Sequence, residues 1–443
     1  MLRLSSFLLF LLLCTIQAVA DEHIRQLTTT LSNHNEFPLV GLGVGNLDHE
    51  LIDEQILKGM EKRRDYRMID TAHASKNEHL VRDGIEQGAT HFEDDVVHVV
   101  TKIWYTHLGY KRTLIAVKEA MKALNSPKIR VTILLHWPFC RDDIDWMDCE
   151  REEDELSAEI RGAGYAPHLD KENAYKESWR ALEDLMLGEA SLGDVGQAKL
   201  ENIGVSNFED KELNELLQVA RIKPHILQAN IWAYIFDPFL MNLIHEHHIH
   251  FQAYNVMNGI LERETQALAP RAFDQLKLIA TKLTYQDFKD GEPPVHVDII
   301  HPSQVVLAWL VQNGVSVIPR TTNMYHLTMN SPHAIAKVPT LTAHQCEQVR
   351  LAVAALLRKE KDLQQPKVSF KNKHHEAVHF YWKDAENGGK EIPVSENVKP
   401  GEEWGTDTYF GHTFVVYNND KSKRKEYTIS ALFGEQDGFE VEL

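Results

Sequence analysis

Three ionisable residues stand where short apolar runs of strand character end. Asp70 follows YRMI, Lys102 follows VVHVVT and His136 follows TILL. Singly, each has an ordinary structural explanation: a helix N-cap, a solvated strand end and a hydrogen-bonded core imidazole. Together, an Asp–Lys pair can keep the lysine charged and lower the pKa of a neighbouring hydroxyl, while a histidine donates to a substrate oxygen. The three residues therefore indicate acid–base chemistry on a substrate oxygen.

Eight strand-like runs that alternate with segments of helical periodicity must position these residues. Regular alternation implies parallel pairing, and eight such units close into a (β/α)₈ TIM barrel, here over residues 37–335. The polar residues at the carboxyl ends of the strands then face one pocket. A doubly wound open sheet is the alternative. The runs are residues 37–45, 66–72, 96–104, 130–138, 201–207, 225–232, 248–257 and 315–321.

The connection after the fourth run is long and acidic. Residues 141–180 hold 13 Asp or Glu against 6 Lys or Arg. In a barrel this insertion lies at the carboxyl face, where active sites are built, so we expect it to shape the mouth of the site. A solvated acidic loop without such a role is the alternative.

The pattern changes after a helix that LQQPK ends, which places a domain boundary near residue 365. Residues 21–365 then form the barrel domain. Residues 366–443 contain strand-like runs separated by turn signals such as NGG and KPG, and they predict a small all-β sandwich domain. The basic run KSKRK lies between two of these strands, where a solvated hairpin loop is expected.

Charge limits the partners of the chain. The formal net charge is −18, from 65 acidic and 47 basic residues, and no Lys/Arg-rich stripe occurs. Phosphate binding needs a basic patch, so a nucleic-acid partner is not expected. Small molecules or proteins are the expected partners.

The first twenty residues have the pattern of a signal peptide: Arg3, an apolar run, and AVA before a cleavage point after Ala20. A membrane anchor is the alternative, but the apolar run is shorter than the roughly 20 residues of a spanning helix. We therefore expect no stable membrane anchor, and localisation in the secretory pathway, either in the ER lumen or outside the cell. In an oxidising lumen Cys140 and Cys149 are close enough in sequence to bridge; three free thiols, with Cys346, are the alternative.

Two other motifs do not indicate sites. GLGVG, residues 41–45, lacks the GxGxxG spacing of a dinucleotide-binding loop. HEHHIH, residues 245–250, lacks the second histidine of HExxH because position 249 is Ile.

Over nearly the whole barrel the sequence resembles the aldo-keto reductase family. The resemblance rests on IDTAHASKNEHLV, TKIW, LLHWP, IGVSNF, LQAN, AYNVM and VIPRTTNMYHLTMN, in the family's order and at comparable spacing. It implies a barrel that binds NADP(H) without a Rossmann fold and passes hydride to a small aldehyde or ketone substrate.

By this resemblance Asp70, Lys102 and His136 match three members of the family's catalytic tetrad. The fourth member is a tyrosine that protonates the alkoxide, and its position here is Ser75. The pKa of tyrosine lies near 10, whereas an aliphatic hydroxyl is far less acidic and its side chain is shorter by a ring. Ser75 is therefore not a simple substitute for the tyrosine.

The resemblance also assigns the cofactor-binding residues. Ser206, Asn207 and Gln228 match residues that hold the nicotinamide amide, and Tyr254 matches the aromatic residue on which the nicotinamide ring stacks. For the adenosine phosphate and the adenine, the matches are Arg320 at a usual lysine, Thr321 at a usual serine, and Asn330. The departures are His326 for an arginine, Met329 for a glutamate and Asn255 for a serine.

The C-terminal region resembles the β domain of the von Hippel-Lindau tumour suppressor, in VSFKNKHHEAVHFYWKD, VKPGEEW and TYFGHTFVVYN. That domain binds peptides bearing hydroxyproline, so the resemblance implies a polypeptide partner. Trp382 and His412 match pocket residues, Thr408 stands at a usual serine and Phe414 at a usual tryptophan. A β sandwich that only packs on the barrel is the alternative.

Two functions follow from these observations. One is an NADP(H)-dependent reductase in which a water held by Ser75, or His136 itself, delivers the proton. The other is a catalytically silent, cofactor-binding barrel that binds proteins through its C-terminal domain.

Overall fold

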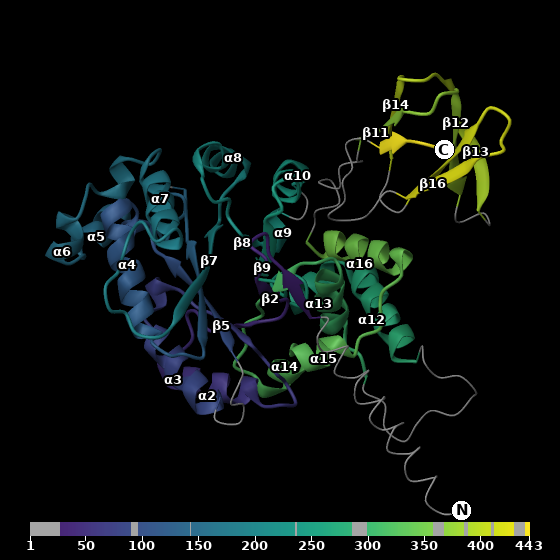
Figure 1. The fold of residues 1–443 in the computed structure, drawn as a ribbon. Helices are drawn as coiled ribbons and strands as arrows, with labels where there is room; N and C mark the ends of the chain where they lie inside the picture. Colours follow the sequence, from purple (N-terminus) through teal and green to yellow (C-terminus); the bar gives the residue numbers. More distant parts are fainter. Residues whose placement is uncertain are drawn as a thin grey trace, which may run out of the picture. The chain divides into compact units, whose positions relative to one another are not determined.

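The computed structural model describes residues 27–89, 96–141, 143–234, 237–285, 299–357, 367–384, 389–408, 412–428 and 439–443 (Figure 1). The expected signal peptide and the expected boundary near residue 365 lie outside these residues. The chain divides into two compact units, Met1–Met257 with Val306–Pro339, and Asn258–Val305 with Thr340–Leu443. Within the described residues, no helix combines the length and the apolar character that crossing a membrane requires.

The first unit contains an eight-stranded sheet whose neighbours all pair in parallel and follow one another in sequence order. The first and last strands also meet, since the Gly41 amide donates to the Val317 carbonyl at 2.9 Å and the Val317 amide to the Leu39 carbonyl at 2.8 Å. The sheet therefore closes, which confirms the predicted barrel and excludes the open sheet. Its strands are β3 (Leu42–Gly43), β4 (Met68–Asp70), β5 (Val97–Ile103), β6 (Ile129–Leu135), β7 (Lys199–Ser206), β8 (Ile226–Asn230), β9 (His250–Tyr254) and β10 (Ser316–Val317).

Part of the barrel interior is a cluster of apolar side chains that the strands and the preceding hairpin supply. An antiparallel hairpin of β1 (Thr28–Thr30) and β2 (Glu36–Pro38) precedes the barrel. Its Asn33 and Asn35 side chains donate to Asn202 Oδ1 of β7 at 2.9 and 3.1 Å. These bonds attach the hairpin to β7. The interior cluster comprises Leu31, Phe37, Met68, Val100, Leu134, Ile226 and Ile318.

Helices surround the sheet because each strand is followed by an amphipathic segment (Figure 1). For example, α4 (Tyr110–Ala123) contacts β5, and α7 (Ala174–Met186) contacts β6 and β7. The other helices of this unit are α2 (His49–Met60), η1 (His73–Ser75), α3 (Glu78–Gly88), η3 (Tyr105–His107), α5 (Cys149–Asp154), α6 (Ala158–Gly162), η4 (Pro167–Leu169), α8 (Asp210–Val219), α9 (Ile231–Tyr234), α10 (Pro238–Glu246), α14 (Met324–Met329) and α15 (Pro332–Ala336).

The second unit combines helices with the C-terminal strands. Its helices are α11 (Arg263–Leu268), α12 (Pro270–Thr284) and α16 (Ala343–Leu356), and α13 (Pro302–Gln312) spans the division between the units. Thr342 and Gln345 form a capping box that fixes the start of α16. Contacts between α12 and α16 hold the helical part together.

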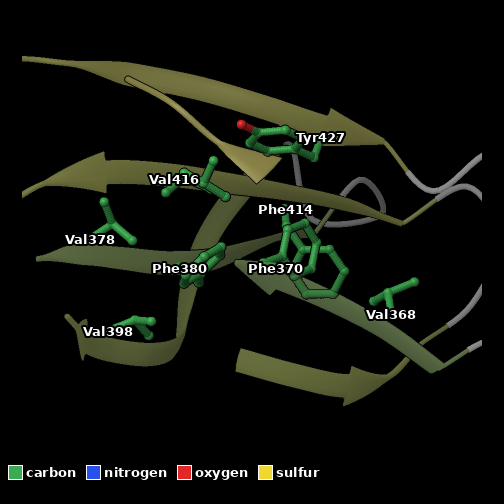
Figure 2. Packing of buried hydrophobic residues seen from close by; sticks show 9 residues of the cluster. Val368, Phe370, Val378, Phe380, Val398, Phe414, Val416 and Tyr427 are labelled. Carbon is green, nitrogen blue, oxygen red and sulfur yellow. The ribbon is translucent and has the colours of Figure 1, made fainter. Parts of the chain in front are cut away.

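The all-β region expected at the C-terminus is present. A three-stranded sheet has the order β14-β11-β17 and a four-stranded sheet the order β13-β12-β15-β16. Both sheets contribute to one core centred on Phe370, whose ring lies 5.1 Å from that of Phe380 and 5.4 Å from that of Phe414 (Figure 2). The strands are β11 (Lys367–Asn372), β12 (Val378–Asp384), β13 (Lys390–Val398), β14 (Glu403–Asp407), β15 (Thr413–Asn418), β16 (Arg424–Thr428) and β17 (Phe439–Val441).

Candidate active site

The structure brings Asp70 and Lys102 into contact. Asp70 ends β4 and Lys102 lies near the end of the adjacent β5. Lys102 Nζ donates to the two Asp70 carboxylate oxygens at 2.8 and 2.9 Å, and to the Thr71 carbonyl at 2.6 Å. Both side chains are buried, with exposed fractions of 6% for Lys102 and 9% for Asp70. A buried ion pair therefore forms the innermost part of the candidate site.

Electrostatics make this pair a tightly coupled unit. Burial raises the pKa of the Asp70 carboxyl, and the Lys102 ammonium opposes that rise. Gln228 Nε2 also donates to Asp70 Oδ2 at 2.7 Å, which favours the carboxylate. Gln228 is itself held by Gln252 Oε1 at 2.7 Å. The polar groups at the centre of the barrel thus form one network in which the pair has little freedom to move.

His136 lies directly after β6, and its backbone amide donates to the Ile103 carbonyl of β5 at 2.9 Å. Burial lowers the pKa of His136 well below its usual value, and the nearby Lys102 ammonium lowers it further. The imidazole is therefore neutral near pH 7 and carries a single N–H. Its Nδ1 is buried and, among the described residues, has no hydrogen-bond partner. His136 can donate one hydrogen bond to a substrate oxygen.

Ser75 ends the short helix η1 after β4, and its backbone amide donates to the Ala72 carbonyl at 2.9 Å. Its side chain is half-buried. The hydroxyl faces Gly45, because a Cβ at position 45 would lie 3.5 Å from Ser75 Oγ. Within the described part of the chain, the partners of Lys102 Nζ are Asp70 and Thr71, and Ser75 Oγ is not among them. The lysine therefore does not activate the serine hydroxyl directly.

The residues expected at the nicotinamide are also together. Tyr254 Oη donates to Asn207 Oδ1 at 2.6 Å, and Asn207 Nδ2 donates to the His136 carbonyl at 2.9 Å and to Ser206 Oγ at 3.2 Å. Asn207 adopts a left-handed φ of 58° directly after β7. Gln228, which holds Asp70, follows on β8. Amide and hydroxyl groups thus lie beside Asp70 and His136.

The residues expected at the adenosine phosphate meet in a pocket of about 500 Å³. Arg320 and Thr321 line it, and Arg320 Nη1 donates to the Gly45 carbonyl at 3.1 Å. Asn330 is buried at the C-cap of α14 and is not among the lining residues. The pocket is lined by Asn46, Leu47, Asp48, Arg320, Thr321, Thr322, Asn323 and His326.

These residues fit a phosphorylated dinucleotide. Arg320 offers a guanidinium that can bind a phosphate through two hydrogen bonds, and Thr321 offers a hydroxyl. Gly45 lies between the pocket of Arg320 and the side chain of Ser75. Its carbonyl accepts a hydrogen bond from Arg320, and a Cβ at this position would lie 3.5 Å from Ser75 Oγ. Asp48 weakens the fit, because its carboxylate repels an anion in the same pocket.

The acidic insertion, residues 141–180, is anchored at the end of the barrel where β6 leads into His136. Cys140 and Cys149 form a disulfide with 6.0 Å between their Cα atoms. Of the two alternatives left open by the sequence, a bridge or three free thiols, the structure has the bridge. Arg112 of α4 donates from Nη1 and Nη2 to the two carboxylate oxygens of Glu153, each at 2.8 Å. Trp104 Nε1 donates to Glu152 at 2.6 Å. A covalent link and a buried ion pair together fix the path of the insertion.

Sequence reasoning missed three tryptophans near His136. The Trp104 ring lies 4.9 Å from the His136 ring and stacks at 6.1 Å on Trp146 of the insertion. Trp137 contacts Trp146 edge to face at 6.2 Å. Trp104 and Trp137 directly follow the strand ends TKI and LLH, and this position in the sequence could have indicated that they lie near the site. No sequence signal indicated that Trp146 lies near the site, because its position depends on the disulfide.

The residues proposed for peptide binding lie in the second unit. The Trp382 and His412 rings are 5.1 Å apart, and Thr408 Oγ1 lies 3.1 Å from His412 Nδ1. Trp382 Nε1 is buried and, among the described residues, has no hydrogen-bond partner. Phe414, by contrast, is 3% exposed and belongs to the β core (Figure 2).

A closed parallel barrel with an Asp–Lys pair and a histidine at three successive strand ends defines a class, and comparison identifies it. Residues 52–352 match the aldo/keto reductase family, and the chain belongs to that family. It is 27% identical over 333 residues to an NAD(P)H-dependent D-xylose reductase of Kluyveromyces lactis, covering 73% of this chain and 91% of that protein. It is 26% identical to an NADPH-dependent aldose reductase of Saccharomyces cerevisiae, covering 72% of this chain and 91% of that protein.

Solved structures agree on the fold of this part of the chain. An aldo/keto reductase from Brucella melitensis matches with a TM-score of 0.52 at 21% identity, covering 73% of this chain and 98% of that one. A Bombyx mori aldo-keto reductase in complex with NADP matches with a TM-score of 0.53 at 22% identity, covering 76% of this chain and 93% of that one.

Proposed function

We propose that this chain is an NADP(H)-dependent oxidoreductase that reduces small aldehydes or ketones. The observation that carries the proposal is the buried Asp70–Lys102 pair beside a neutral His136. The two curated reductases to which the chain is similar use NAD(P)H or NADPH. Arg320 in the phosphate pocket favours a cofactor with an additional phosphate.

The residues of the chain can orient and polarise a carbonyl group. Ser206, Asn207 and Gln228 would hold the nicotinamide amide, and the bound cofactor supplies hydride to the carbonyl carbon. His136 donates its N–H to the carbonyl oxygen and stabilises the negative charge that develops there. Lys102, fixed by Asp70, adds positive charge close to the same oxygen.

Proton delivery distinguishes this chain from its family. Ser75 is too weak an acid and too short to replace a tyrosine directly, so the proton comes from solvent, relayed either by a water held by Ser75 or through the His136 N–H, which takes a proton back from solvent. A general acid typically contributes about 10²- to 10⁴-fold to a rate. We therefore expect slow but measurable turnover.

NADPH oxidation by the chain without residues 1–20, followed with a panel of aldehydes and ketones, tests the proposal. We expect turnover in the wild type and faster turnover in Ser75→Tyr. Ser75→Ala is the matched control: its rate falls if Ser75 holds the donating water and stays unchanged if His136 is the donor. Absence of turnover in both the wild type and Ser75→Tyr would overturn the proposal, and fluorescence titration with NADPH would then show whether a silent, cofactor-binding barrel remains.

A second function, polypeptide binding by the C-terminal β region, is favoured by the buried and unpartnered indole N–H of Trp382 beside His412 and Thr408. An unpaired buried donor costs about 1–3 kcal/mol, and a ligand acceptor such as a hydroxyproline oxygen would remove that cost. We expect hydroxyproline-bearing peptides to bind. Trp382→Phe keeps a ring but removes the N–H, and it should weaken binding about tenfold. Equal binding of prolyl and hydroxyprolyl peptides would contradict this function.

We also propose that the chain enters the secretory pathway. The sequence of residues 1–20 supports this, and so does the Cys140–Cys149 disulfide, because such bridges persist in oxidising compartments. Mass spectrometry of the protein expressed in eukaryotic cells should find an N-terminus at Asp21. An intact Met1 would contradict the proposal.

A further inference from the structure

The loop between β11 and β12 gathers three potential metal ligands. His374, His375 and Glu376 each offer one ligand atom, and these atoms lie within 4.8 Å of one another. His375 Nε2 lies 3.5 Å from a Glu376 carboxylate oxygen. Zinc bonds of about 2.0–2.1 Å in a tetrahedron place ligand atoms roughly 3.4 Å apart. The loop is therefore close to the geometry that a small divalent ion needs.

Asn372 holds this loop in shape. Its Oδ1 accepts from the His374 backbone amide at 2.8 Å, and its Nδ2 donates to the Glu376 carbonyl at 2.8 Å. Nδ2 also donates to the Val398 carbonyl of β13 at 2.8 Å, and the Asn372 side chain is fully buried. One side chain thus fixes the backbone at both the first and the last ligand. Such support reduces the ordering cost of binding.

A second observation concerns His374. The residue is only 6% exposed, and its Nε2 is buried without a hydrogen-bond partner in the described part of the chain. Buried imidazole nitrogens are normally paired with protein groups, water or an ion. A metal ion bound at this nitrogen would give it a partner.

The surroundings of His374 include charges of both signs. Glu442 and Glu376 lie near enough to interact with its ring electrostatically, and so does Lys423. Lys423 Nζ donates to the Leu443 carbonyl at 3.1 Å, which gives that ammonium a partner of its own. Glu442 adds negative charge near His374 but is not one of the three clustered ligands.

We propose that His374, His375 and Glu376 bind a divalent transition-metal ion of the zinc class, with water completing the coordination. Two imidazoles and one carboxylate favour zinc, copper or nickel over magnesium and calcium, which prefer oxygen ligands only. The site is independent of the barrel chemistry proposed above.

Titration of metal-free chain 21–443 with ZnCl₂, in competition with a chromophoric chelator, tests the proposal. We expect one equivalent to bind at micromolar affinity or tighter, and a His374→Ala/His375→Ala/Glu376→Gln variant to lose that equivalent. Because the chain has 24 histidines, His245→Ala/His247→Ala controls for the other histidine-rich segment and should retain the equivalent. An unchanged stoichiometry in the triple variant would overturn the proposal.

His375→Ala alone covers the case in which the triple variant misfolds, since His375 has an exposed side chain at 71%. We expect at least tenfold weaker zinc binding from the loss of this one ligand. His379→Ala, on the adjacent β12, is the matched control and should bind as the wild type does. Equal affinity of His375→Ala and His379→Ala would exclude the site.

Discussion

At the scale of single residues, the pair between Lys102 and Asp70 organises the polar interior of the barrel. Lys102 joins the ends of β4 and β5, and Gln228 extends the same network to β8. Breaking a buried pair by removing one partner leaves an uncompensated charge, which costs more than removing both partners.

Lys102→Met should therefore destabilise the barrel by about 3–5 kcal/mol. Lys102→Met/Asp70→Leu removes both charges and should recover most of that loss. Urea denaturation of the two variants and the wild type measures the difference. If the double variant is less stable than the single one, the charge of Asp70 does not cause the loss. Both variants should lose carbonyl reduction, since neither places a cation at the site.

His225 gives the barrel a dependence on pH. It is buried, its Nδ1 accepts from the Ile203 amide at 3.1 Å, and burial lowers its pKa to about 4. As the pH falls below about 6.5, the unfolded chain binds a proton that the folded chain does not bind until about pH 4, so stability falls across this window.

His225→Asn keeps an acceptor for Ile203 but removes the titrating ring. Between pH 6.0 and 4.5 the wild type should lose about 2 kcal/mol more stability than this variant, at about 1.36 kcal/mol per pH unit. Denaturant midpoints at both pH values provide the measurement, with the exposed His79→Asn as control. Parallel losses in wild type and His225→Asn would contradict the assignment.

The sequence predicted that Asp70 and Lys102 would meet, with His136 at the next strand end, because parallel strands bring their carboxyl ends together whatever the side chains are. It did not predict that Gln228 would donate to Asp70, since that depends on side-chain direction across the barrel. Nor did it reveal Trp146, whose place is set by long-range contacts of the insertion.

At the scale of elements, the insertion after β6 is fixed more firmly than its acidic composition suggests. The disulfide closes its first segment, and the Arg112–Glu153 pair holds α5 against the barrel. Helices α5 and α6 were not expected from the sequence, because elements of 6 and 5 residues are too short to show helical periodicity. The eight strand runs were long enough, and all of them form strands.

Cys149→Ser should loosen this insertion without unfolding the barrel. Closing a short loop by a disulfide contributes roughly 2–3 kcal/mol, mainly by restricting the open chain. We expect cleavage by an arginine-specific protease at Arg151 or Arg161 to become several-fold faster. Cys346→Ser, which leaves the bridge intact, should be cleaved at the wild-type rate. Resistance of Cys149→Ser to cleavage would show that Glu153 alone is sufficient to hold the insertion.

At the scale of the whole molecule, the chain contains two units with separate cores. The core of the C-terminal β region combines five valines with four aromatic residues grouped around Phe370 (Figure 2). The sequence signalled this change through its turn-rich, alternating pattern after residue 365.

Phe370→Ala should destabilise the C-terminal β region by about 3–5 kcal/mol, because the residue is fully buried and its ring contacts four other aromatic rings. We expect calorimetry to show a low-temperature transition for this region, while NADPH titration of the first unit remains unchanged. Val100→Ala, in the barrel interior, is the reciprocal control and should shift the other transition. A single transition shared by both variants would mean that the units unfold together.

The bridge between Cys140 and Cys149 begins four residues after His136. A chain made in a reducing cytoplasm would complete its barrel with this cross-link open and Trp146 untethered beside the histidine. Two preparations of identical sequence would then differ in the rim of the site according to where each was oxidised. Thiol counting is therefore as necessary as mass determination before the activities of two batches are compared.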